Sequence, residues 1–142
     1  MRTHWKSNTL FYSVIVIYLV LTYWLLWPYV PIEIHNIEIM NKDNIAYAGD
    51  VLKYSVNYTK DYSYPVVKVT RQLIDGTVIV LPSGKTSRLP VGDHTVSVEV
   101  KIPDYICSNT YIFHLTAEYK VNPLRTVTVF ARSKPFLIRR NE

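Results

Sequence analysis

Cysteine and glycine are scarce in this 142-residue chain, which holds one cysteine, Cys107, and four glycines. A single cysteine cannot form a disulfide within the chain, so packing and hydrogen bonds have to hold the fold together. We expect Cys107 to be a small buried hydrophobe, and a disulfide between two chains is the alternative. One cysteine and four scattered histidines match no metal-ligand spacing, so the sequence predicts neither a metal centre nor a cofactor.

Catalytic motifs are missing as well. The chain has no Gly-x-Ser-x-Gly nucleophile motif, and Asp50, Asp75 and Asp93 stand beside glycines in turn sequences, where Asp is favoured for its local hydrogen bonds. His114 occupies the polar phase of an alternating run, so we expect it on the solvent face.

The 16 Lys and Arg exceed the 11 acidic residues only mildly and form no dense basic stripe of the kind that binds nucleic acid. We therefore predict neither an enzyme nor a nucleic-acid partner.

Charge is wholly absent between Ser7 and Ile32. A helix needs about 20 apolar residues to cross the hydrocarbon layer, and this stretch has that length without a polar face. Pro28 and Pro31 then end the helix because proline cannot donate to the helical hydrogen bonds. The sequence predicts one transmembrane helix over residues 9–30, in contact with the bilayer.

Aromatic residues stand at both ends of this segment, where amphipathic rings suit the headgroup layer. The predicted membrane-interface anchors are Trp5, Tyr23, Trp24, Trp27 and Tyr29.

The charges that flank the helix predict its orientation. Arg2 and Lys6 precede it, whereas all 11 acidic residues follow it, beginning with Glu33. Positive charge is retained in the cytoplasm. We expect residues 1–8 to be a cytoplasmic tail and residues 31–142 to lie outside the cytoplasm, in a periplasmic or extracellular compartment.

A cleaved signal peptide is the alternative to this membrane anchor. Its apolar region spans about 7–15 residues and ends at a small-residue cleavage site. The segment here is longer and ends in Trp27-Pro28-Tyr29-Val30-Pro31, so we favour an uncleaved signal-anchor.

Beyond Pro31 the periodicity changes to two, which is typical of strands with one buried face and one wet face. Three runs alternate strictly, with apolar positions at Leu52, Tyr54, Val56 and Tyr58, at Val96, Val98, Val100 and Ile102, and at Tyr111, Phe113, Leu115, Ala117 and Tyr119. Further runs occupy 32–40, 65–74, 77–81 and 126–132, and a slip of phase predicts a bulge near His35-Asn36. We predict an all-β antiparallel sandwich of about seven strands.

Several sequence features of residues 32–135 resemble immunoglobulin-like and fibronectin-III-like domains of surface proteins. They are Gly49-Asp50 leading into an alternating strand, Leu89-Pro90-Val91-Gly92-Asp93-His94 before another, then Ile102-Pro103 and a strand led by Tyr111. The disulfide pair of that superfamily is absent, and no Trp lies after Trp27. The resemblance implies an Ig-like fold and a habit of binding.

Two surfaces are candidate binding sites. Tyr62 and Tyr64 belong to a loop in which exposed rings would contact a protein or a glycan, and the alternative is that they fold back over the end of the sandwich. The basic C-terminal tail would dock a partner or lie on an anionic surface, and the alternative is a frayed, solvated tail. Its candidate residues are Arg132, Lys134, Arg139 and Arg140.

These expectations combine into a membrane-anchored, non-enzymatic binding or interaction module with a protein or glycan partner near the membrane surface. The alternative is a structural subunit of a larger envelope or phage-encoded membrane assembly. Asn57-Tyr58-Thr59 fits the N-glycosylation pattern and matters only in a eukaryotic secretory route.

Overall fold

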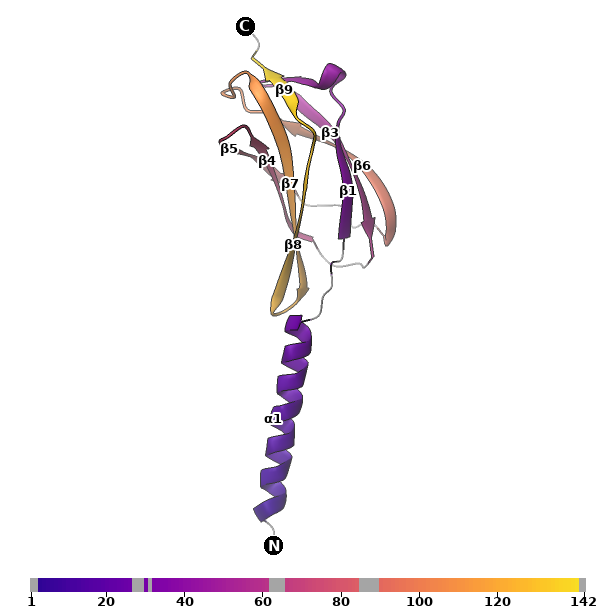
Figure 1. The fold of residues 1–142 in the computed structure, drawn as a ribbon, viewed down its shortest axis with the longest axis vertical. Helices are drawn as coiled ribbons and strands as arrows, with labels where there is room; N and C mark the ends of the chain where they lie inside the picture. Colours follow the sequence, from indigo (N-terminus) through magenta and orange to yellow (C-terminus); the bar gives the residue numbers. More distant parts are fainter. Residues whose placement is uncertain (1–2, 27–29, 31, 62–65, 85–89, 141–142) are drawn as a thin grey trace.

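The computed structural model describes residues 3–26, 30, 32–61, 66–84 and 90–140. It consists of one N-terminal apolar helix followed by a β-rich domain (Figure 1). Helix α1 (Thr3–Leu26) contains the 19-residue stretch Asn8–Leu26, which is long and apolar enough to span a membrane or to act as a signal, and none of this stretch is buried against the domain. The helix thus begins before the predicted residue 9, and residues 27–29 of the predicted span lie outside the described ranges.

The described ranges contain nine strands, where the alternation predicted about seven. They are β1 (Ile32–Ile39), β2 (Ile45–Tyr47), β3 (Val51–Lys60), β4 (Val66–Ile74), β5 (Val78–Gly84), β6 (Gly92–Lys101), β7 (Asn109–Asn122), β8 (Arg125–Arg132) and β9 (Phe136–Arg139). The two strands missing from the prediction, β2 and β9, are too short to show a period of two.

The strands form two sheets. The smaller has the order β1-β3-β6 and is antiparallel; the larger has the order β2-β9-β7-β4-β5, with β8 also paired to β7. Long strand β7 pairs first with β9 and then with β8 along the same edge, and the larger sheet curls into a half-barrel. Strands β2 and β9 run parallel, so the prediction of a wholly antiparallel fold is wrong at this pair.

The core lies between the two sheets, on the faces that the alternation predicted. Tyr54 of β3 is buried and meets Phe113 of β7 with ring centroids 4.5 Å apart, which joins the sheets at the centre. Leu52 and Val56 share the inward face of β3, and Leu115 and other alternate residues of β7 face them. The register of β1 on β3 shifts between Ile34 and Asn36, so the predicted bulge at His35 is confirmed.

One prediction and one alternative for the C-terminal half are wrong. Cys107, predicted to be buried, is exposed, because its neighbour Ile106 occupies the core position in the loop that precedes β7. The alternative of a frayed, solvated tail fails because this segment contains strand β9, whose Phe136 and Ile138 are 3% and 0% exposed. A tail with two large apolar side chains at alternate positions gains more from burial than from fraying.

Candidate functional site

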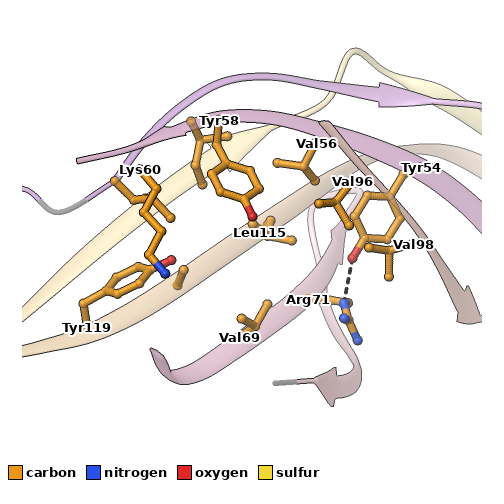
Figure 2. A pocket seen from close by; sticks show the side chains of 13 residues that line it. Tyr54, Val56, Tyr58, Lys60, Val69, Arg71, Val96, Val98, Leu115 and Tyr119 are labelled. Atoms are coloured by element: carbon orange, nitrogen blue, oxygen red, sulfur yellow. Dashed lines mark hydrogen bonds between the residues drawn. The ribbon is translucent and has the colours of Figure 1, made fainter. Parts of the chain in front are cut away.

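A partly enclosed cavity of about 220 Å³ lies between the two sheets (Figure 2). Strands β1, β3 and β6 supply one wall, and β4 and β7 supply the other. The lining residues are Ile32, Ile34, Tyr54, Val56, Tyr58, Lys60, Val69, Arg71, Val96, Val98, Leu115, Ala117 and Tyr119.

The charged side chains that line the cavity are all positive. Eight of the thirteen side chains are aliphatic, three are tyrosines, and two are the cationic side chains of Lys60 and Arg71. No acidic side chain is among the lining residues within the described part of the chain. The charged side chains that line this cavity within the described ranges are therefore both cationic.

Arg71 is held at one end of the cavity by two hydrogen bonds. Its Nε donates to the hydroxyl oxygen of Tyr54 at 2.7 Å, and its Nη1 donates to the carbonyl oxygen of Pro82 at 3.0 Å. Gly84 leaves room for the guanidinium, because a Cβ added there would lie 2.5 Å from Nη2 of Arg71. Burial raises the pKa of Tyr54, and the charge and hydrogen bond of Arg71 offset part of that rise.

Lys60 lies at the other end of the cavity, nearest to α1. It is the last residue of β3, pairs with Ile32 at the start of β1, and is only 5% exposed. In Figure 2 its amine and the hydroxyl of Tyr119 point toward each other. Burial, and next the neighbouring Tyr58, raise the pKa of Tyr119 to about 12. Its hydroxyl therefore keeps its proton at neutral pH and can donate to an anion.

None of the predicted binding residues that the structure describes lines this cavity. Tyr62 and Tyr64 lie outside the described residues. Exposed side chains at Arg132, Lys134, Arg139 and Arg140 belong to β8, to β9 and to the segments beside β9, away from the cavity wall.

The predicted membrane anchors are described only in part. Tyr23 and Trp24 are 54% and 38% exposed on the last turns of α1, as expected for rings in the headgroup layer. The side chain of Trp5 and the whole of Trp27 and Tyr29 lie outside the described part.

A signal for the cavity was present in the sequence. Lys60 continues the apolar phase of Tyr54 and Tyr58, and Arg71 shares the phase of Val69 and Leu73, which are buried. A charged residue in the inward phase of a strand predicts a buried charge. Which inward charges meet across the core depends on strand pairing, and periodicity does not report pairing.

Comparison with protein-family models and with curated proteins finds no match. Among solved structures, the C-terminal domain of wzt is similar with a TM-score of 0.53 and 7% identity, over 80% of this chain and 75% of that one. A β-glucosidase involved in saponin metabolism from intestinal bacteria has a TM-score of 0.42 and 14% identity, over 75% of this chain and 16% of that one. Alkylpurine DNA glycosylase AlkC of Pseudomonas fluorescens has a TM-score of 0.43 and 13% identity, over 78% and 31%. The similarity to the wzt domain concerns the fold alone.

Proposed function

We propose that this protein is a membrane-anchored, non-enzymatic binding domain of Ig-like architecture, and that the cavity between its sheets takes a small anionic amphiphile. The observation that carries the proposal is that Lys60 and Arg71 stand among aliphatic side chains and that no acidic residue lines the cavity in the described ranges. Apolar walls with a few placed polar groups are the usual make-up of a ligand site.

The charge of the cavity selects the charge of the ligand. An anion at the Lys60 end would receive a charge-assisted hydrogen bond, and such bonds are about twice as strong as neutral ones. The hydroxyls of Tyr58 and Tyr119 add donors beside it. A cationic ligand would meet two like charges, which disfavours its binding.

The volume of the cavity limits the size of the ligand. A dry apolar cavity of about 150 Å³ binds benzene, and the present one measures about 220 Å³. Scaling from benzene gives roughly nine enclosed non-hydrogen atoms. Medium-chain carboxylates have this size, with a chain that suits Val56, Val98 and Leu115 and a head group that suits the Lys60 end.

The anchor gives the binding site its location. With the signal-anchor orientation, the domain stands outside the cytoplasm, and its first strand begins at Ile32, shortly after α1 ends at Leu26. Tethering near a surface raises the effective concentration toward ligands at that surface, so modest affinity is sufficient.

Calorimetric titration of octanoate into the full chain in phosphatidylcholine nanodiscs tests the proposal, with empty discs subtracted. We expect saturable binding of octanoate and weaker binding of octanol, which has no charge. Lys60→Met keeps most of the side-chain volume and should weaken octanoate binding at least about tenfold, since a hydrogen bond to a charged group contributes about 1.5–3 kcal/mol. Lys101→Met is the matched control, because Lys101 is exposed on β6.

Two results would contradict this assignment. One is the absence of saturable heat above that of empty discs. The other is equal loss of binding in the Lys60 and Lys101 variants, which would place the anion on the outer surface instead of in the cavity.

A further inference from the structure

The turn between β7 and β8 touches the end of the membrane-spanning helix (Figure 1). Nδ2 of Asn122 donates to the carbonyl oxygen of Trp24 at 2.8 Å, and Oδ1 of the same side chain accepts from the backbone N–H of Leu124 at 2.9 Å. The last four carbonyls of a helix lack partners within the helix, and Trp24 is one of these residues. A single asparagine therefore shapes the turn and joins it to α1.

This contact determines the depth of the turn relative to the bilayer. Trp24 lies two residues before the end of α1 at Leu26, which is about 3 Å along the helix axis. Its neighbour Tyr23 is exposed, and both rings suit the headgroup layer. A turn that is hydrogen-bonded to the backbone of Trp24 lies at the same level.

The side chains of the turn suit that level. Leu124 is 52% exposed at the tip. Lys120 is exposed two residues before the turn, and the half-buried Arg125 opens β8 directly after it. Glu118 is the nearest acidic residue along the hairpin; it is half-buried and pairs with Thr128, farther from the tip.

We propose that the tip of the β7–β8 hairpin is a second membrane contact, in which Leu124 enters the headgroup layer and Lys120 and Arg125 face the phosphates of anionic lipids. This contact goes beyond the proposed ligand site and does not depend on it. Together with α1 it gives the domain two points of attachment. The Lys60 end of the cavity then faces the bilayer, whereas a single flexible tether would leave the orientation open.

Depth-dependent quenching in the full chain tests the proposal. A Cys107→Ser background removes the only cysteine, and Leu124→Cys then carries an environment-sensitive fluorophore in nanodiscs of phosphatidylcholine and phosphatidylglycerol with brominated acyl chains. Val78→Cys is the matched control, because Val78 is a 59% exposed apolar residue paired with Ile74, at the end of β4 remote from α1. Near-UV circular dichroism checks that both labelled chains are folded.

We expect the brominated acyl chains to reduce the emission of the fluorophore at position 124 and to leave the emission at position 78 unchanged. The loss at position 124 should be smaller in discs without phosphatidylglycerol, and the double variant Lys120→Gln/Arg125→Gln should abolish this difference between the two kinds of disc. Equal emission from both labels in both discs would overturn the membrane contact. If the loss at position 124 changes neither with the lipid charge nor with the double variant, the role given to the two cations is overturned.

Discussion

His114 shows how neighbours on an exposed face change the chemistry of a side chain. It lies in β7 between Gln72 of β4 and Arg132 of β8, and its ring meets the ring of Phe130 at a centroid distance of 5.9 Å. The residue is half-buried, and neither ring nitrogen has a hydrogen-bond partner among the described residues. Burial first, and the charge of Arg132 second, lower the pKa of His114. The sequence therefore placed His114 on the correct face of β7, but its side chain is half-buried where an exposed one was expected.

The lowered pKa of His114 predicts a loss of stability in mild acid. In the unfolded chain the imidazole binds its proton near pH 6.5, whereas the folded domain resists protonation at this site. Its contribution to stability is therefore present above about pH 6.5 and is lost as the pH falls toward the folded pKa. We expect His114→Gln to flatten the fall in melting temperature between about pH 7.5 and 5.5, as followed by circular dichroism in nanodiscs.

Exposed His35 provides the control for this experiment. His35→Gln should leave the pH dependence of the melting temperature as it is in the unmodified chain. If both variants fall as steeply as the unmodified chain, another group causes the acid response.

At the scale of elements, the passage from β8 to β9 is held by one buried serine. Oγ of Ser133 accepts from the backbone N–H of Phe113 at 3.0 Å and donates to the carbonyl oxygen of Lys134 at 2.8 Å. The N–H of Ser133 also donates to the carbonyl oxygen of Phe113 at 2.9 Å. The chain thus leaves β8 without losing contact with β7 and continues as β9 along the same strand.

Strand β9 makes the C-terminal segment part of the core. Shortening a buried side chain of β9 should therefore lower the free energy of unfolding substantially. Ile138 is fully buried and pairs with Asn109 of β7 and Ala46 of β2. Ile138→Ala should destabilise the domain by about 2–5 kcal/mol, which lowers the melting temperature by roughly 10 °C or more for a domain of this size. Arg139→Ala, at an exposed neighbouring position, should change it little.

Thermal unfolding of the two variants, followed by near-UV circular dichroism, measures this difference. A small effect of Ile138→Ala would mean that β9 is not packed as described and that the tail is available for a partner.

At the scale of the whole molecule, α1 is long and apolar enough to span a membrane or to act as a signal. None of the stretch Asn8–Leu26 is buried against the domain, as is typical of a helix that is covered by lipid or acts as a signal. The charges before and after it favour an N-terminus in the cytoplasm. In the topology that we propose, the domain stands on the other side of the membrane, with the β7–β8 hairpin nearest to the bilayer.

Protease protection in sealed spheroplasts tests this topology, with a tag at each end of the full chain. We expect external protease to remove the C-terminal tag and leave the N-terminal tag protected, with both tags on one full-length chain before digestion. Detergent-permeabilised membranes serve as the control in which both tags are cut. A protected C-terminal tag would reverse the orientation, and loss of the N-terminal tag before digestion would indicate a cleaved signal peptide.

The sequence by itself determined the apolar helix, the seven longer strands and the inward faces of the strictly alternating ones. An uninterrupted apolar run without charge has to be a helix with its surface in lipid or a signal, and a period of two has to place alternate side chains on one face. The burial of Tyr54, Phe113 and Tyr119 follows from that period alone, as does the bulge at His35. These properties are local, so neighbouring residues in the chain suffice to reveal them.

Only the tertiary structure decided which faces and edges meet. The parallel pairing of β2 with β9, the capping of Trp24 by Asn122, and a cavity with Lys60 at one end and Arg71 at the other all join residues far apart in the chain. Periodicity states that a side chain points inward, but the partner across the core depends on how two sheets stack and curl. The candidate site is made of such long-range contacts, so the pattern of loop and tail residues in the sequence does not indicate it.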